Sequence, residues 1–227
     1  MVWEVDGVES ALSLRNRDSY SFLINGKVDG SAIGDAATQV MGGLMVSLLH
    51  PKPLRSLVIG LGTGSTAGWL GKIDSMEKVD VAEIEPAMVK VAQVCGPVNQ
   101  DALHNPKIHL LFHDAREVLL TTREKYDLIF SEPSNPYRAG ISSLYTKEFY
   151  QGVAAALAEK GYFAQWVQSY NIGAETFYCI LTTLSSVFPH ISLWQTNTSD
   201  LFFVCSMHPQ THSPGELRLK AAREPYA

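Results

Sequence analysis

The stretch "VIGLGTGST", residues 58–66, decides the fold. It extends an apolar run typical of a buried strand and then opens a helix, so a tight turn must join the two. Gly60, Gly62 and Gly64 permit that turn and let the backbone approach a ligand closely. Ser65 stands where a dinucleotide motif of the form GxGxxG needs its third glycine. The spacing therefore favours a nucleoside without a pyrophosphate over NAD, with a glycine turn used only for packing as the alternative.

Strands and helices alternate after this turn. Further strands are predicted at "KVDVAEIE", "IHLLFHDA", "YDLIFSE" and "GYFAQWVQ", and helices at residues 86–94, 116–120, 146–159 and 174–187. Two last strands, "ISLWQT" and "LFFVCS", lie close together in the sequence and are expected to pair antiparallel. Such alternation predicts an α/β fold with a mostly parallel sheet covered on both faces.

The domain organisation predicted from these elements has three parts. Residues 1–35 form a small N-terminal β region with a hairpin at Asn25-Gly26, followed by a helix from about Asp35 to Leu49. Residues 36–208 form the main α/β domain. Residues 209–227 are expected to be a polar, frayed tail or a linker.

Composition excludes several classes of function. The chain has 227 residues, 46% of them hydrophobic, and a net charge of -5, so we expect no nucleic-acid partner. We also expect no membrane span, because no apolar run approaches about 18 residues. No signal peptide is expected, because the N-terminal stretch "MVWEVDGVES" lacks a basic region followed by an apolar one. Cys95, Cys179 and Cys205 are interpreted as reduced core residues of a cytoplasmic protein. The seven histidines show no metal-type spacing, so no metal is expected.

Acidic residues follow the second and third strands. The segment "VAEIE" places Glu83 or Glu85 where an acid accepts both ribose hydroxyls; we favour Glu83 and expect the other to be a solvated loop acid. Asp114 follows the next strand and is positioned to accept a hydrogen bond from an adenine amine, or to cap the helix near Arg116. Both roles are compatible. The pattern predicts an adenosine-bearing ligand of the S-adenosylmethionine type.

The fourth strand ends in "SEPSNPY", residues 131–137. Pro133 and Pro136 restrict the loop behind Glu132, so its carboxylate is held in a defined position beside the nucleoside. That restriction is useful in a catalytic or binding site. The alternative is an exposed glutamate on a loop that leads into the next helix.

Together, these motifs resemble those of the spermidine synthase (polyamine aminopropyltransferase) family, from about Tyr20 to Ser206. The segment "LVIGLGTGSTAGWL" is similar to its GGGDG motif and "VAEIEP" to its ribose-binding EID. The segment "HDA", ending in Asp114 and Ala115, is similar to its adenine-side GD. "SEPSNP" stands in place of DSSDP. The combination looks most like the divergent bacterial spermidine-synthase-like branch.

The resemblance implies a Rossmann-like, seven-stranded fold of the S-adenosylmethionine-dependent methyltransferase type. It further implies transfer of an aminopropyl group from decarboxylated S-adenosylmethionine to a diamine such as putrescine, and a homodimer. Glu132 occupies the position of the family's catalytic aspartate and is our candidate for the base or amine anchor. Two alternatives remain open: a methyltransferase that uses S-adenosylmethionine, and a non-catalytic nucleoside-binding domain of a larger protein.

The polyamine side of the site departs from the family pattern. Thr63 replaces the GGGDG aspartate, Asn135 replaces the second acid of DSSDP, and Asp29 replaces a glutamine after the hairpin. We expect Asn135 and Asp29 to contact the substrate. Asp29 is also a candidate replacement for the acid lost at Thr63.

Two further family motifs are altered. Thr38 and Val40 stand at the tyrosine and glutamate of a YxE motif, and Gln39 between them is a candidate substrate ligand. A TYPSG-like loop reads "TNTSD" at residues 196–200 and has no tyrosine. Gln168, after the fifth strand, is a candidate for the acceptor pocket; the alternative is a polar strand end that faces solvent.

Overall fold

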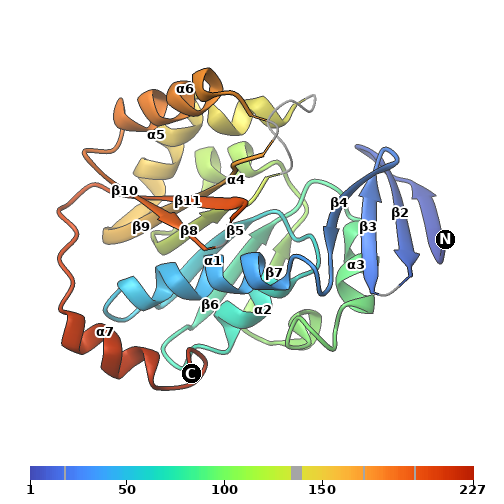
Figure 1. Ribbon diagram of the computed structural model, residues 1–227, viewed down its shortest axis with the longest axis horizontal. Helices are drawn as coiled ribbons and strands as arrows, with labels where there is room; N and C mark the ends of the chain where they lie inside the picture. Colours follow the sequence, from blue (N-terminus) through green and yellow to red (C-terminus); the bar gives the residue numbers. More distant parts are fainter. Residues whose placement is uncertain (18, 134–139, 171, 197) are drawn as a thin grey trace.

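The computed structural model describes residues 1–17, 19–133, 140–170, 172–196 and 198–227, and it has two β-sheets with helices around the larger one (Figure 1). The larger sheet has the strand order β10-β11-β9-β8-β5-β6-β7. Its strands are β5 (Arg55–Ile59), β6 (Lys78–Ala82), β7 (Ile108–Leu111), β8 (Tyr126–Ser131), β9 (Leu157–Gln168), β10 (His190–Gln195) and β11 (Asp200–Ser206). β5 to β9 pair in parallel, whereas β11 is antiparallel to both β9 and β10. The predicted α/β fold with seven strands is confirmed.

The order in which strands are added to the sheet switches from one side of β5 to the other between β7 and β8. After β5 the chain continues outward to β6 and β7, then returns to place β8 on the other side of β5. Ile59 and Ser131, the last residues of the two strands, lie directly opposite each other. Gly60 and Glu132 therefore leave the sheet side by side, at the switch point where open parallel sheets bind ligands.

Helices cover both faces of this sheet, and the hydrophobic core is divided accordingly (Figure 1). One face packs against α1 (Ala36–Leu49), α2 (Ser65–Gly71) and α3 (Met88–Val94); the other packs against α4 (Ala115–Thr121), α5 (Lys147–Ala156) and α6 (Ala174–Ser185). Two short 3-10 helices, η1 (Ala102–His104) and η2 (Ile141–Tyr145), lie in the connections. Because both faces are buried, the central strands read as continuous apolar runs rather than as alternating ones.

A second, antiparallel sheet lies beside the glycine-turn end of the main sheet. It contains β1 (Trp3–Asp6), β2 (Ala11–Asn16), β3 (Tyr20–Ile24) and β4 (Lys27–Ser31), paired in chain order. Asn25 and Gly26 have φ of 50° and 80° at the turn between β3 and β4, so the predicted hairpin is confirmed. The sequence signal identified this hairpin, but the structure extends it to a four-stranded sheet.

Two local predictions were wrong. The predicted helix to Glu159 ends at Ala156, because β9 already begins at Leu157 and pairs there with Tyr126. Cys179 is exposed on α6 rather than buried, whereas Cys95 and Cys205 are buried as expected. These errors arise because local apolar patterns do not show which side of a helix meets the sheet.

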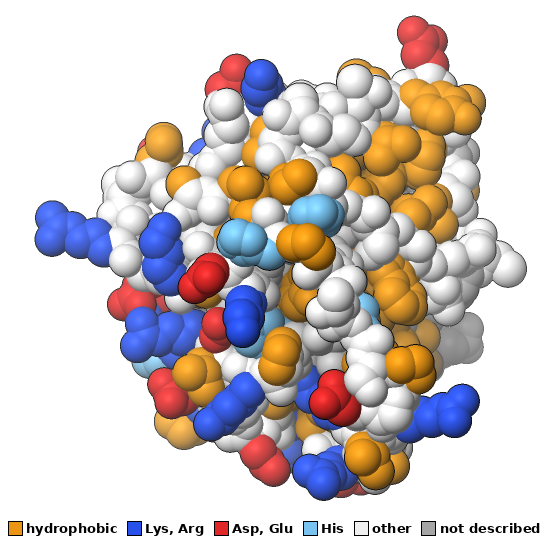
Figure 2. Space-filling model, turned by 90° about the vertical axis from the view of Figure 1, so that its left-hand side faces the viewer, with side chains coloured by type: hydrophobic (Ala, Val, Ile, Leu, Met, Phe, Trp, Pro, Cys, Tyr) orange, Lys and Arg blue, Asp and Glu red, His pale blue; other side chains and the backbone are white. Residues whose placement is uncertain are grey.

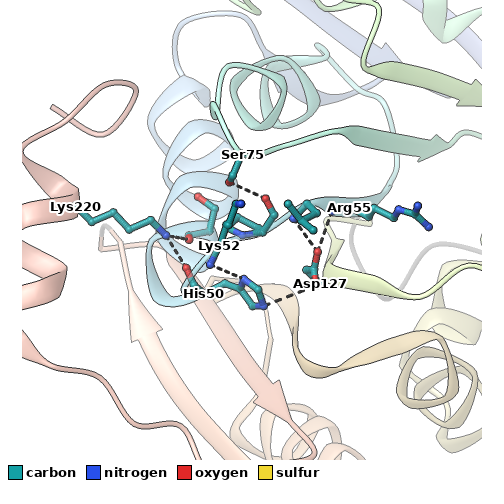
Figure 3. Close-up of polar contacts among 9 residues, drawn as sticks. His50, Lys52, Arg55, Ser75, Asp127 and Lys220 are labelled. Atoms are coloured by element: carbon teal, nitrogen blue, oxygen red, sulfur yellow. Dashed lines mark hydrogen bonds and ion pairs between the residues drawn. The ribbon is translucent and has the colours of Figure 1, made fainter.

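The predicted frayed tail is also wrong. Residues 214–221 form a helix, α7 (Pro214–Ala221), capped by Ser213, whose hydroxyl accepts from the Glu216 amide at 3.4 Å. Lys220 donates from Nζ to the carbonyl oxygens of Ser47 (2.5 Å), Leu48 (3.3 Å) and His50 (2.6 Å). Figure 3 shows the Lys220 side chain extending from α7 toward the end of α1. Those carbonyls belong to the last turn of α1, where backbone acceptors lack partners within the helix. The tail therefore docks on α1 instead of fraying.

The edge formed by β10 is partly apolar. Figure 2 views the molecule from this side, and hydrophobic side chains gather on one part of the face, with most charged groups on the other. An apolar groove of about 430 Å³ lies here, lined by residues of α6, β10 and their surroundings: Phe177, Leu181, Ser185, Phe188, Pro189, Ile191, Leu193 and Phe203. Across the described ranges, no helix has the length and apolar character required to cross a membrane.

Candidate functional site

The glycine turn has the geometry that its sequence requires. Gly60, Gly62 and Gly64 have φ of 96°, 50° and 80°, values that residues with a side chain rarely adopt. A Cβ added to Gly60 would first meet the Glu132 carbonyl oxygen at 3.5 Å. The turn thus leaves its backbone open toward the end of β8.

Asn99 supports this turn from behind, a role that sequence reasoning missed. Its Nδ2 donates to the carbonyl oxygens of Thr63 at 2.7 Å and Ala92 at 2.8 Å, and its Oδ1 accepts from the Ala102 amide at 3.1 Å. Asn99 is fully buried. A Cβ on Gly64 would lie 2.9 Å from Asn99 Nδ2, so Gly64 is needed for close packing as well as for its φ.

Glu83 lies at the carboxyl edge of the sheet, next to the glycine turn. Its Oε2 accepts from the Leu61 amide at 2.8 Å and its Oε1 accepts from the Glu85 amide at 2.8 Å. Burial raises the pKa of the Glu83 carboxyl above its usual value, against the lowering effect of these amides. Each carboxylate oxygen can accept a second hydrogen bond, so this arrangement is compatible with ribose binding.

The neighbouring acid, Glu85, is not the solvated loop residue that we expected. It is only 3% exposed. Its Oε2 accepts from the Glu9 amide at 2.9 Å and its Oε1 from the Ala87 amide at 3.0 Å. Glu85 therefore joins the turn after β1 to the main domain, a contact between distant parts of the chain that no local pattern shows.

Asp114 caps α4, as one of the two sequence interpretations states. It accepts from the Arg116 amide at 2.8 Å and from the Arg116 side chain at 3.0 Å (Nε to Oδ1) and 2.5 Å (Nη2 to Oδ2). These contacts lower the pKa of the Asp114 carboxyl. Ala115, the first residue of α4, is buried behind it. Both follow β7, on the side of β6 away from β5.

Glu132 immediately follows β8 and is partly accessible. Its Oε2 accepts from Thr66 Oγ1 at 3.1 Å, and the same hydroxyl is 3.0 Å from the backbone oxygen of Gln39. Glu132 is thus oriented by α2, the helix that the glycine turn opens. None of the ion pairs found within the described ranges involves Glu132.

The pKa of Glu132 is raised to about 8, and burial is the main cause. The negative charges of Asp200, Asp35 and Asp29 raise it further, whereas the hydrogen bond from Thr66 lowers it. These three aspartates come from the start of β11, the residue before α1, and β4. Four carboxyl groups therefore share one region, and sequence reasoning had identified only Glu132 and Asp29.

Asp200 and Asp35 each have defined partners. Asp200 accepts from Thr38 Oγ1 at 2.5 Å and from Trp166 Nε1 at 2.9 Å. Asp35 accepts from the Ser31 amide at 2.7 Å, which fixes the start of α1 relative to β4. Asp200 and Asp35 are far from Glu132 in the sequence, so only the spatial arrangement of the strands reveals their proximity to it.

Gln39, a candidate substrate ligand, is buried in α1 beside the glycine turn. Thr63 donates from Oγ1 to Gln39 Oε1, and Thr63 Oγ1 is also 2.9 Å from Ser65 Oγ. The hydroxyl that replaces the family's donor-side aspartate is therefore engaged within the protein. Gln39 orders this part of the site, and its contact with a substrate remains a prediction.

Gln165 and Gln168 belong to β9 itself and are buried, which excludes a solvent-facing strand end. Neither the Nε2 nor the Oε1 of Gln168 has a hydrogen-bond partner within the structure's described portion. Asn135, the remaining substrate candidate, lies outside the described residues. Within the described part of the chain, no group of three or more His, Cys, Asp or Glu side chains is suited to hold a metal ion.

The family model "Spermine/spermidine synthase domain" matches residues 36–202. The chain belongs to the spermine/spermidine synthase family. This match spans α1 to the start of β11 and so includes the glycine turn, Glu132 and Asp200.

Among curated members of the spermine/spermidine synthase family, a polyamine aminopropyltransferase of Alkaliphilus oremlandii is 33% identical over 112 residues, 49% of this chain and 39% of that protein. A thermospermine synthase of Arabidopsis thaliana is 32% identical over 151 residues, 65% of this chain and 44% of that protein. A polyamine aminopropyltransferase of Saccharolobus solfataricus is 28% identical over 174 residues, 75% of this chain and 58% of that protein. The aligned part thus spans about two fifths to three fifths of these relatives.

Solved structures agree on the fold. A spermidine synthase in complex with the transition-state analogue AdoDATO superposes with a TM-score of 0.85 at 21% identity, over 100% of this chain and 81% of that one. Human methyltransferase-like protein 13 in complex with SAH gives 0.60 at 23% identity, over 82% of this chain and 86% of that one. The Rossmann-like, methyltransferase-type architecture that we predicted is therefore confirmed.

Proposed function

We propose that this chain transfers an aminopropyl group from decarboxylated S-adenosylmethionine to an amine. The observation that carries the proposal is the position of Glu132, beside the open glycine turn and among three aspartates. Membership of the spermine/spermidine synthase family supports the reaction class.

The residues at the glycine turn fit a nucleoside. A Cβ on Gly60 or Gly62 would meet no heavy atom closer than 3.5 Å or 3.8 Å, so this backbone surface is open to a ligand. Glu83 keeps lone pairs for the ribose hydroxyls, and Asp114 with Ala115 lies on the adenine side. The donor would occupy this edge and supply a carbon next to a sulfonium.

Glu132 then acts on the acceptor. An alkyl ammonium has a pKa of roughly 10 and must lose a proton before its nitrogen can attack. The Glu132 carboxylate accepts that proton and leaves a lone pair on the nitrogen. This lone pair then forms the new carbon–nitrogen bond as the carbon–sulfur bond breaks, with the carbon–sulfur electron pair leaving on sulfur. A base with a pKa of about 8 is well matched to operation near neutral pH. Asp29, Asp35 and Asp200 favour a cationic acceptor at the same place.

Donor exchange with mass analysis tests this function. The protein is incubated with an amine and either decarboxylated S-adenosylmethionine or S-adenosylmethionine. Methylthioadenosine from the first donor supports aminopropyl transfer, whereas S-adenosylhomocysteine from the second would replace it with methyl transfer. A rise in melting temperature with methylthioadenosine but no product from either donor would instead favour a non-catalytic nucleoside-binding domain.

We also propose three properties that the family resemblance implies or the fold supports. The chain would act as a homodimer in the cytoplasm, and the apolar groove beside β10 is compatible with a subunit contact. Residues 1–35 and 36–208 would form the small β region and the catalytic domain, since β4 ends at Ser31 and α1 begins at Ala36. Light scattering of the purified protein measures the first property directly.

A further inference from the structure

The Thr66 hydroxyl lies between two acceptors at the carboxyl edge of the main sheet. Thr66 Oγ1 is 3.1 Å from Glu132 Oε2 and 3.0 Å from the backbone carbonyl oxygen of Gln39. Both distances are within hydrogen-bonding range, yet a hydroxyl carries a single proton and donates one full hydrogen bond at a time. The structure therefore contains a donor with two alternative acceptors, and one of these acceptors is the proposed base.

Packing fixes the position of this hydroxyl. Thr66 is buried in the first turn of α2, where a β-branched side chain has few rotamers. A Cβ added to Gly43 of α1 would lie 3.3 Å from the Thr66 methyl carbon, so this glycine lets the two helices approach closely. The methyl group is thus placed beside Gly43, while the hydroxyl is directed to Gln39 and Glu132.

The Gln39 carbonyl can accept from Thr66 without losing its helical hydrogen bond. Gln39 lies in the first turn of α1, where its carbonyl is the acceptor for the amide four residues further along the helix. A carbonyl oxygen has two lone pairs, so the second one is left for the Thr66 hydroxyl. Thr66 can therefore turn toward Gln39 or away from it, and in neither case is a buried backbone acceptor left unpaired.

Glu132 needs a different partner in each of its protonation states. As a carboxylate it can only accept, and the Thr66 hydroxyl is a suitable donor. As a carboxylic acid with its proton on Oε2, Glu132 becomes the donor, and Thr66 Oγ1 must accept. Thr66 can do so if its own proton turns to the Gln39 carbonyl by rotation about the bond between Cβ and Oγ1. A backbone amide at this place could only donate, and would serve one state alone.

The charged surroundings of Glu132 make this hydroxyl important. Asp200 from β11, Asp35 from the residue before α1 and Asp29 from β4 all raise the pKa of Glu132, and burial raises it most. Among the described groups that act on this pKa, the Thr66 hydroxyl is the one whose hydrogen bond lowers it. The ionised form of the proposed base therefore depends on Thr66.

We propose that Thr66 is a positioning residue with two hydrogen-bonding arrangements, one for each protonation state of Glu132. Before proton transfer, Thr66 donates to the Glu132 carboxylate. After the carboxylate has taken the proton of the ammonium group, Glu132 donates to Thr66 Oγ1 and the Thr66 proton turns to the Gln39 carbonyl. Thr66 itself neither gains nor loses a proton. The inference rests on the proposed function and adds to it the residue that holds the base in place throughout the proton transfer.

The pH dependence of kcat/KM for 1,4-diaminobutane tests this role. Thr66→Val keeps the shape of the side chain but has no donor, so the midpoint near pH 8 should move up by about one unit or more. Thr66→Ser keeps the hydroxyl and should restore the wild-type midpoint. Thr121→Val is the matched control, because the exposed Thr121 hydroxyl donates to the Glu117 carbonyl, and it should leave the midpoint unchanged. An unchanged midpoint in Thr66→Val, or equal shifts in Thr66→Val and Thr66→Ser, would overturn the proposal.

Direct titration of the carboxyl group separates this inference from failure of the proposed reaction. NMR of protein isotopically labelled at the side-chain carboxyl of glutamate follows the protonation of Glu132 without substrate, and Glu132→Gln assigns its signal. A higher Glu132 pKa in Thr66→Val, with no transfer product from the wild type, would support the role of Thr66 and disprove the reaction. Transfer by the wild type with the same Glu132 pKa in both proteins would do the reverse. If Thr66→Val does not fold, Thr66→Ala removes the same hydroxyl and gives the same measurement.

Discussion

The two ends of β8 each carry a carboxylate, and they differ in what surrounds them. At the amino end, Asp127 accepts from the backbone amides of Leu54 at 2.7 Å and Arg55 at 3.0 Å, and lies 3.8 Å from His50 Nε2 (Figure 3). Just past the carboxyl end, Glu132 has the Thr66 hydroxyl as a partner and aspartates as its charged neighbours. The same strand therefore carries Asp127, which is surrounded by hydrogen-bond donors, and leads to Glu132, which lies near other carboxylates.

Polar groups at the amino edge are used to close the fold. Lys220 Nζ donates to three carbonyl oxygens at the end of α1, and Ser75 Oγ donates to the Pro53 carbonyl at 2.7 Å (Figure 3). At the carboxyl edge, in contrast, like charges gather and Gln168 lacks partners among the described residues. Clustered carboxylates and an unpaired buried amide lower the stability of the folded protein unless a ligand binds to them. We therefore interpret the polar groups at the amino edge as structural and those at the carboxyl edge as functional.

The largest expected effect is on the functional acid. Glu132→Gln should lower kcat by roughly 10²–10⁴-fold, the usual contribution of a general base, because the amide cannot accept the proton. Binding of methylthioadenosine should stay near wild type by calorimetry, since the glycine turn is untouched. Turnover that survives unchanged would show that Glu132 is not the base.

The pH dependence of kcat/KM should also test whether Glu132 is the base. The proposed base must be ionised to accept a proton, so kcat/KM should rise as pH increases through about 8, with a change near tenfold between pH 7 and pH 9. The Glu132→Gln variant is the control, because its profile reports only the titration of the amine. A wild-type profile of the same shape would contradict the assignment.

Stability should show the opposite trend with pH. The folded-state pKa of Glu132 is raised, so between about 4.5 and 8 the folded protein binds more protons than the unfolded chain. Its contribution to stability is present below 4.5 and is lost as pH rises through about 8. Urea unfolding of wild type and Glu132→Gln should therefore diverge as pH rises, with the variant gaining relative stability.

A smaller effect is expected at the amino edge. Lys220→Met should lower the free energy of unfolding by about 1–3 kcal/mol, because three carbonyl oxygens lose their donor. Arg218→Met on the exposed side of α7 is the matched control and should change little. Both are measured by urea unfolding, and kcat of the folded Lys220→Met protein should be retained. An equal effect of the two substitutions would show that Lys220 does not secure the tail.

The smallest effect is expected at Asp114. Asp114→Asn keeps a residue that caps α4 well but removes the charge that Arg116 contacts, so the free energy of unfolding should fall by only about 0.2–1 kcal/mol. Calorimetry with methylthioadenosine should show a modest loss of affinity on the adenine side. Unchanged affinity would limit Asp114 to its structural role as a cap.

Local sequence determined the elements and the glycine turn at the proposed nucleoside site. The continuous apolar run ending at Ile59 and the glycines at positive φ specify a buried strand and its turn from short-range sterics alone. The Asn25-Gly26 hairpin and the cap at Asp114 likewise depend on residues close in sequence. These features could be predicted because their physical causes lie within a few residues.

Only the tertiary structure brought together what the sequence separates. Asp200 accepts a hydrogen bond from Thr38, 162 positions away, and Glu85 accepts one from the turn after β1. Lys220, near the far end of the chain, donates to a carbonyl oxygen at the end of α1. Each contact depends on strand order and on which face of the sheet a side chain leaves, and neither is encoded in a local pattern. The sequence by itself determined the elements, the fold class and the glycine turn. The packing of distant strands decided which acids surround Glu132, because charge interactions depend on distance in space rather than along the chain.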